Sequence, residues 1–131
     1  MVSDNIKDYK CPVEYSLSII GGKWKTVILW HLASEGVKRY GEIKKSLNGI
    51  THKTLSAQLK ELESDGLINR KEYQQIPPKV EYSLTAYGQG MEPILNMLCT
   101  WGEKHVELLQ DKGEDVLLKQ RDDDIAMQQT S

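Results

Sequence analysis

Small and cationic side chains share one side of a predicted helix between Ile50 and Asp65. Leucines at positions 55, 59 and 62 give this segment one apolar stripe at the helical period of about 3.6 residues. At about 100° per residue, the opposite side carries small or basic groups instead of the Glu–Lys pairs of a helix that faces only water. These residues are Lys53, Thr54, Ala57 and Lys60, with Ser56 on the border of the face. Such a face suits contact with phosphates and with base edges.

Cys11 is the residue whose side chain is best placed to react. Pro12, which follows it, suits the first position of a helix, so Cys11 would be the N-cap. There the partial positive charge of the helix and the neighbouring Lys10 favour a thiolate, the nucleophilic form of cysteine. Two hypotheses remain open: Cys11 senses oxidants or electrophiles, or it caps a helix without a regulatory role. The second cysteine, Cys99, is predicted to pack in the interior rather than to form a disulfide between subunits.

The predicted polar helix has a clear start and a clear end. Thr51 suits its N-cap because a threonine hydroxyl accepts a hydrogen bond from an N–H of the first turn. Asp65-Gly66 ends it, since glycine readily leaves the helical conformation. His52 follows the cap directly and is interpreted either as a structural residue or as a phosphate contact.

A hairpin is predicted directly after this helix. Residues 67–73 and 80–84 alternate and contain β-formers, and the segment between them includes Pro77-Pro78. Proline cannot donate to a strand ladder, so the prolines belong in the hairpin tip. Arg70, Lys71 and Lys79 are expected near this tip, where they would meet a phosphate backbone. A helix that runs into such a hairpin predicts a winged helix-turn-helix, with the hairpin as the wing.

Shorter elements are predicted before the polar helix. The pattern favours helices over residues 12–20, 23–33 and 41–47, an extended segment at 38–40, and a turn at Asn48-Gly49. The first two helices are expected to point apolar side chains inward. These are Val13, Leu17 and Ile20 in the first helix, and Trp24, Val27, Ile28 and Leu32 in the second.

A long apolar pattern follows the hairpin, from Met91 to Leu109. It keeps helical spacing over about five turns, and Pro93 is tolerated only near the start of the helix. The apolar face is wider than a small domain can cover, which predicts a dimer seam. A helix that only packs on the core is the alternative. The predicted seam residues are Met91, Ile94, Leu95, Leu98, Trp101, His105 and Leu108.

Several spaced motifs resemble the HxlR family of bacterial transcriptional regulators. They are Gly21-Gly22-Lys23-Trp24, Arg39-Tyr40-Gly41-Glu42-Ile43, Leu59-Lys60-Glu61-Leu62-Glu63 and Pro77-Pro78-Lys79-Val80-Glu81-Tyr82-Ser83-Leu84-Thr85. The resemblance covers roughly Cys11 to Trp101. It implies a homodimer that binds DNA through winged helix-turn-helices, and a cysteine near position 11 that senses oxidants or electrophiles in some members. Tyr40 and Ile43 stand where Phe and Leu are usual, and Lys79 stands where Arg is frequent and could have made a bidentate contact.

Charge is unevenly distributed along the chain. The whole chain has a net charge of −2, whereas residues 36–80 hold nine Lys/Arg against five Asp/Glu, a net charge of +4. The position of positive charge matters more than its sum for contact with phosphates. Residues 112–131 are rich in acids and predict a flexible tail after a domain that spans residues 1–111.

Other functions lack their signatures. No run approaches the roughly 20 apolar residues of a membrane span, and the start of the chain does not resemble a signal peptide, so a cytoplasmic protein with no membrane partner is expected. The three histidines are far apart and no Cys-x-x-Cys pair accompanies them, which argues against a metal site. Gly88-Gln89-Gly90 and Gly21-Gly22-Lys23 lack the other residues of phosphate-binding loops. Neither a catalytic residue nor a cofactor is expected.

The expected architecture is mainly α with a small β-hairpin wing, and it is dimerised through its terminal helices. The expected partner is a pseudo-palindromic double-stranded DNA operator. Each recognition helix would enter a major groove, while the wing touches the minor groove or backbone and Arg39 clamps a phosphate. The alternative is a winged-helix module that binds proteins, which would have no need for Arg39, Lys53, Lys60 and Arg70 on one surface. No particular small-molecule effector is predicted.

Overall fold

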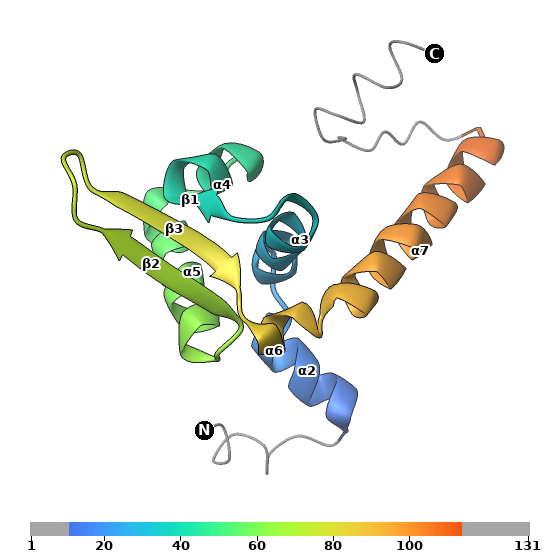
Figure 1. Ribbon diagram of the computed structural model, residues 1–131. Coiled ribbons are helices and arrows are strands. Elements are labelled where there is room, and N and C mark those ends of the chain that lie inside the picture. Colours follow the sequence, from blue (N-terminus) through green and yellow to red (C-terminus); the bar gives the residue numbers. More distant parts are fainter. Residues whose placement is uncertain (1–10, 114–131) are drawn as a thin grey trace. The chain divides into compact units, whose positions relative to one another are not determined.

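The computed structural model describes residues 11–113, which are mainly helical with one small sheet (Figure 1). The elements are α2 (Pro12–Ile20), α3 (Lys25–Glu35), β1 (Lys38–Arg39), α4 (Tyr40–Ser46), α5 (His52–Ser64), β2 (Ile68–Tyr73), β3 (Lys79–Leu84), α6 (Ala86–Gln89) and α7 (Glu92–Asp111). The helices predicted before the hairpin are confirmed to within two residues at each end. The predicted acidic tail lies, from residue 114 onward, outside the described residues.

The sheet has three antiparallel strands in the order β1-β3-β2. The predicted hairpin is confirmed, and its register places Arg70 opposite Tyr82 and Lys71 opposite Glu81. The third strand is β1, in which Arg39 also pairs with Glu81. A two-residue strand is too short to show a period-two pattern, so the sequence predicts an extended segment there without indicating its pairing.

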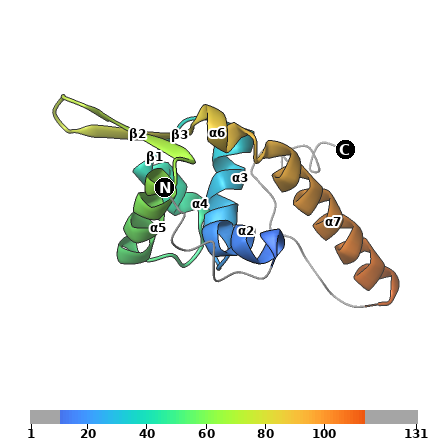
Figure 2. The same ribbon diagram turned by 90° about the horizontal axis from the view of Figure 1, so that it is seen from below.

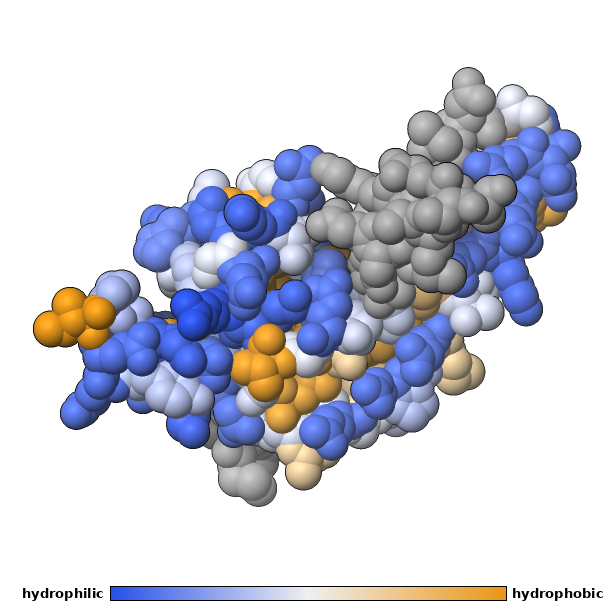
Figure 3. All heavy atoms as spheres, turned by 45° about the horizontal axis from the view of Figure 1, so that its top comes forward, coloured by the Kyte–Doolittle hydropathy of each residue, from blue (hydrophilic) through white to orange (hydrophobic). Residues whose placement is uncertain are grey.

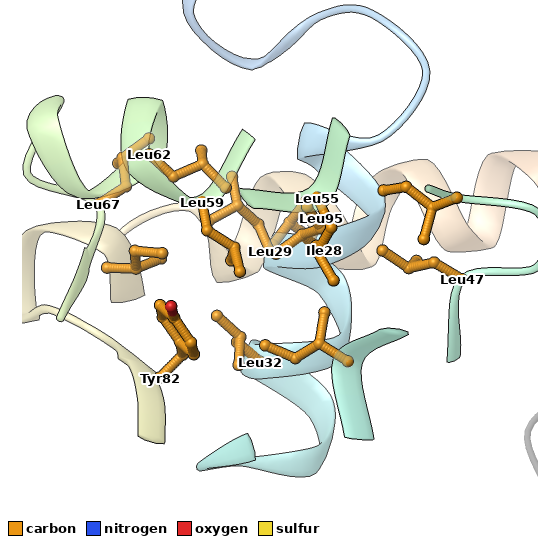
Figure 4. Close-up of a cluster of buried hydrophobic side chains, with 13 residues drawn as sticks. Ile28, Leu29, Leu32, Leu47, Leu55, Leu59, Leu62, Leu67, Tyr82 and Leu95 are labelled. Atoms are coloured by element: carbon orange, nitrogen blue, oxygen red, sulfur yellow. The ribbon is translucent and has the colours of Figure 1, made fainter. Parts of the chain in front are cut away.

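A cluster of buried apolar side chains forms the core of the unit that contains the sheet (Figure 4). The predicted stripe of α5 is confirmed, because Leu55, Leu59 and Leu62 are each at most 2% exposed. The stripe packs with residues from the neighbouring helices and strands. These are Ile28, Leu29, Leu32, Ile43, Leu47, Ile50, Leu67, Ile68, Tyr82 and Leu95. Burial of one leucine side chain contributes roughly 1.5–3 kcal/mol, so the stripe commits one face of α5 to the core.

Three side chains that were predicted to point inward are exposed. Val13 and Leu17 of α2 are 67% and 59% exposed, and Val27 of α3 is 40% exposed. Leu29, which the periodicity did not select, is fully buried instead. Helical spacing identifies an apolar face but not the surface that covers it, and within residues 11–113 the faces of Val13 and Leu17 stay uncovered.

Capping groups set the helix ends. Thr51 Oγ1 accepts a hydrogen bond from the N–H of Thr54 at 3.1 Å, which confirms the predicted N-cap of α5. Gly66, which follows the end of α5, has a φ of +78°, in the left-handed region that favours glycine. Cys11 is the N-cap of α2 as predicted, and its Sγ accepts a hydrogen bond from the N–H of Glu14 at 3.5 Å.

A tight joint connects the hairpin to α6. The Thr85 hydroxyl donates a hydrogen bond to the carbonyl oxygen of Gly66 at 2.6 Å. The same Oγ1 accepts a hydrogen bond from the backbone N–H of Gly88 at 2.8 Å. Gly88 is buried, and a Cβ at this position would lie 2.1 Å from the carbonyl oxygen of Leu67. The joint therefore requires glycine at position 88, because backbone meets backbone there.

The last helix of residues 11–113 is α7, and α6 forms a separate turn before it (Figure 2). Pro93 lies in the first turn of α7, where a missing N–H costs no helical hydrogen bond. The chain divides into two compact units after Leu95. The assignment of Leu95 to the dimer seam is wrong, because its side chain is 2% exposed and belongs to the core of its own chain. Met91 also packs partly against that core.

Candidate nucleic-acid interface

The residues predicted to contact DNA are all at least partly exposed, and they form three groups. Lys53, Thr54 and Ala57 lie on the outward face of α5. His52, Ser56, Lys60 and Arg70 line a groove between α5 and the hairpin. Arg39, Lys71 and Lys79 lie on the outer face of the sheet. Figure 3 shows mainly hydrophilic side chains on the visible face of the hairpin region.

The outward face of α5 points away from its leucine stripe. Lys53 and Ala57 are exposed, and Thr54 is half-buried. The Thr51 hydroxyl donates to Thr54 Oγ1 at 3.0 Å, so Thr54 also takes part in the N-cap. Lys53 can donate to a guanine edge or to a phosphate, and the small side chain of Ala57 permits close approach.

The groove between α5 and the hairpin has a volume of about 450 Å³. Lys60 and Glu63 line it from α5, and Arg70 lines it from β2. Side chains alternate between the two faces of a strand, so Arg70 points into the groove while the adjacent Lys71 points to the other face of the hairpin. The sequence grouped these two cations at the tip, but the register separates them.

Tyr40, the first residue of α4, ties α4 to the beginning of α5. Its hydroxyl lies 2.5 Å from Nδ1 of His52 and 3.4 Å from Oγ of Ser56, and it also donates to the backbone carbonyl of His52 at 3.2 Å. The rings of Tyr40 and His52 meet edge to face, with centroids 5.2 Å apart. His52 and Ser56 therefore have a partner inside the protein, and Nε2 is the ring nitrogen of His52 that Tyr40 leaves available.

Arg70 is held by an acid on the same strand. Its Nη1 donates to Oε1 of Glu72 at 3.2 Å, and the two side chains are 41% and 57% exposed. The hydroxyl of Tyr82 and then Glu72 raise the pKa of the Arg70 guanidinium, which stays charged at any physiological pH. A guanidinium has five N–H donors, so Arg70 can hold Glu72 and a further anion together.

The outer face of the sheet carries a second cluster of charge, centred on Glu81. The Tyr73 hydroxyl donates to Oε1 of Glu81 at 2.8 Å, and Nζ of Lys79 lies 3.6 Å from Oε2 of the same carboxylate. Ammonium groups of Lys71 and Lys79 also lie 4.9 and 4.5 Å from the centroid of the Tyr73 ring. The hydrogen bond from Tyr73, and then the charges of Lys79 and Arg39, lower the pKa of Glu81 despite an opposing effect of desolvation. These contacts organise the wing cations before any partner binds.

Sequence inspection missed Tyr40, Glu72, Tyr73 and Glu81. Alternation along residues 68–73 was a usable signal, since it separates Arg70 from Lys71 and places Lys71 on the same face as Tyr73. The contact of Tyr40 with α5 had no such signal, because it joins residues 12 positions apart through the turn between the helices.

Cys11 is exposed at the start of α2, which agrees with an accessible thiol. Cys99 is partly exposed on α7. Trp101, predicted to lie in the dimer seam, is 66% exposed in this chain, and its ring stacks on that of His105 with centroids 5.1 Å apart.

The helix α7 presents an apolar face to solvent in the single chain. Its side chains recur at helical spacing, and they are about half exposed or more. They are Ile94, Met97, Leu98, Trp101 and Leu108. Large apolar side chains that are gathered on one helix face mark a surface for association.

Within residues 11–113, no group of three or more His, Cys, Asp or Glu side chains is arranged to hold a metal ion. In the same part of the chain, no helix is long and apolar enough to cross a bilayer.

The fold and the cationic surfaces around α5 define a winged helix-turn-helix of the kind that binds DNA. The HxlR-like helix-turn-helix family matches residues 19–110, and the chain belongs to this family. Its members are transcriptional regulators, not enzymes.

Relatives support this assignment over most of their length. The chain is 61% identical over 97 residues to MalR of Fusobacterium mortiferum, covering 74% of this chain and 92% of MalR. It is 55% identical over 100 residues to the HTH-type transcriptional regulator YtcD of Bacillus subtilis, covering 76% of this chain and 79% of YtcD. Among solved structures, the reduced redox regulator HypR is similar with a TM-score of 0.71 and 44% identity, covering 77% of this chain and 99% of that chain.

The Tyr73–Glu81 contact predicts a pH-dependent contribution to stability. Folding lowers the pKa of Glu81 below its ordinary value of 4.5, so the contribution is present above pH 4.5 and is lost as pH falls through the lower folded value. Tyr73→Phe should raise the pKa of Glu81 in the folded protein. The variant should have a lower free energy of unfolding than the wild type at pH 7, and this difference should be smaller at pH 3. NMR titration of the Glu81 carboxyl and urea unfolding at both pH values measure this. Tyr87→Phe, at an exposed tyrosine, is the control. An unchanged Glu81 pKa in Tyr73→Phe would contradict the prediction.

Proposed function

We propose that this regulator binds a pseudo-palindromic DNA operator as a homodimer. In each protomer α5 would enter a major groove, and the hairpin would contact the neighbouring minor groove or backbone. The observation that carries the proposal is the division of α5. One face holds three buried leucines, whereas the opposite face carries Lys53 and Ala57 in the open. A helix whose apolar face is packed on the core and whose opposite face is exposed can enter a DNA groove without a change of fold.

The competing function is a winged-helix module that binds another protein. Protein interfaces are depleted of charged residues at their centres. Here Lys53, Lys60 and Arg70 surround the surface that such a partner would have to cover. Charge of this sign and density favours a phosphate backbone as the partner.

Binding of the protein to its own promoter region tests the proposal. Affinity should fall steeply with salt, since each phosphate contact adds about 0.9 to the slope of log affinity against log salt. Lys53→Ala should lower the preference for the operator over random duplex by roughly 1–3 kcal/mol if it removes a base contact. Lys79→Ala should weaken binding to the operator and to random duplex by the same factor. Flat salt dependence, or no bound genomic fragment, would instead support the protein-interaction module.

Dimerisation through α7 is proposed from its exposed apolar face. Leu98 is 52% exposed and Trp101 is 66% exposed in the single chain, and a second copy would remove both from water. Leu98→Glu places a charge in this seam, which is costly to bury without a partner. The variant should be monomeric by light scattering at micromolar concentration and should bind the operator weakly. Thr100→Glu adds the same charge on another side of α7 and should remain dimeric. A monomeric wild type would refute the seam.

Redox control through Cys11 is a second proposed function. It is supported by the exposed thiol at the N-cap of α2 and by the similarity of the chain to HypR, which is described as a redox regulator. A quinone or a mild oxidant should modify Cys11 before Cys99 and alter operator affinity, because reactivity follows thiolate content and access. Cys11→Ser should still bind DNA, but its operator affinity should no longer change with the oxidant. Cys99→Ser should bind DNA and respond to the oxidant as the wild type does. A Cys11→Ser protein that responds like wild type would leave Cys11 as a helix cap.

A further inference from the structure

The groove between α5 and the hairpin lies where DNA geometry requires a strand of backbone. In B-form DNA the major groove is about 12 Å wide and the minor groove about 6 Å wide, and a sugar–phosphate backbone separates them. When α5 occupies the major groove and the hairpin the adjacent minor groove, that backbone must pass between these two elements. The groove of about 450 Å³ is the space that the protein leaves there.

The walls of the groove carry two cations, and Leu59, Val80 and Tyr82 also line it. Lys60 projects from α5 on one wall and Arg70 from β2 on the other. Within residues 11–113 Lys60 forms no ion pair, and Arg70 has donors beyond the one that holds Glu72. Two cations on facing walls suit one phosphodiester, which offers two charged oxygens.

We propose that this groove seats the DNA backbone between the major and the minor groove, with Lys60 and Arg70 clamping one shared phosphate. The inference rests on the proposed operator binding and adds to it a specific phosphate and the two residues that hold it. Glu72 keeps the Arg70 side chain in place before binding, and the phosphate then competes with Glu72 for the guanidinium.

The polar end of the groove completes the seat. The Tyr40 hydroxyl lies 2.5 Å from Nδ1 of His52, and when Nδ1 accepts its proton, Nε2 carries the ring N–H that can donate to a phosphate oxygen. The hydroxyls of Tyr40 and Ser56 line the same end and carry no negative charge. Glu63 is the acid that lines the groove, and it repels a second phosphate in its vicinity.

Replacement of single operator phosphates by neutral methylphosphonates tests the shared clamp. In the full-length wild type, the substitution at the clamped phosphate should weaken binding roughly tenfold or more, as expected for a charge-assisted hydrogen bond. Lys60→Gln and Arg70→Gln should each weaken binding to the natural operator. In both variants the methylphosphonate at that same phosphate should weaken binding less than it does in the wild type, because one of the two cations that hold the phosphate is gone.

Lys71→Gln is the matched control, because Lys71 adjoins Arg70 in β2 but lies on the opposite face of the hairpin. It should keep the wild-type sensitivity at the clamped phosphate. Thermal melting should show that the Lys60, Arg70 and Lys71 variants stay folded, since all three side chains are exposed. Arg70→Lys should restore part of the sensitivity, because it retains charge but loses the planar fork.

The outcomes separate this inference from the proposed function. If the wild type binds its operator but Lys60→Gln and Arg70→Gln affect different phosphates, the shared clamp is overturned and operator binding stands. A wild type that binds no DNA overturns both. A free inorganic anion is the other source of a phosphate group. If no single methylphosphonate weakens operator binding by the wild type, while inorganic phosphate binds the free protein in a way that Lys60→Gln and Arg70→Gln abolish, the groove belongs to that anion and the backbone seat is overturned.

Discussion

The packing of three leucines from α5 against the core is the constraint on which the surrounding structure depends. Leu55, Leu59 and Leu62 are nearly inaccessible to water, and they determine which side of α5 remains exposed. A rotation of α5 by one residue would turn a leucine out and bury a polar side chain, and both changes cost free energy. The orientation of Lys53 and Ala57 thus follows from apolar burial several ångströms away.

Local patterns in the sequence were sufficient to predict where the helices and strands lie. They were not sufficient to predict which elements pair or pack with one another. The apolar period located α5, Thr51 marked its start, and the paired prolines located the hairpin tip. The pairing of β1 with β3 could not be predicted, because a strand of two residues has no period. Leu95 was misplaced for a related reason: a helix can use the same apolar stripe for its own core in one turn and for another surface in the next.

The candidate site could be predicted as a set of residues but not as an arrangement. Composition located nine cations between residues 36 and 80, whereas the strand register distributes the cations of the hairpin over its two faces. On each face an acid holds an arginine or a lysine, Glu72 beside Arg70 and Glu81 beside Lys79. Exposed ion pairs contribute little to stability, so their main effect is to limit the rotamers of the cations. A prearranged cation loses less conformational entropy on binding.

The two ends of the hairpin have opposite tolerance to mutation. At its base, Gly88 faces the carbonyl of Leu67 so closely that no other residue fits without a shift of the backbone. At its tip, Ile76 is fully exposed and contributes nothing to the core. Over evolutionary time, substitutions can therefore accumulate at the tip while the base stays constant. A lineage of such proteins can change the surface that its wing presents and still inherit an unaltered connection between the wing and α6.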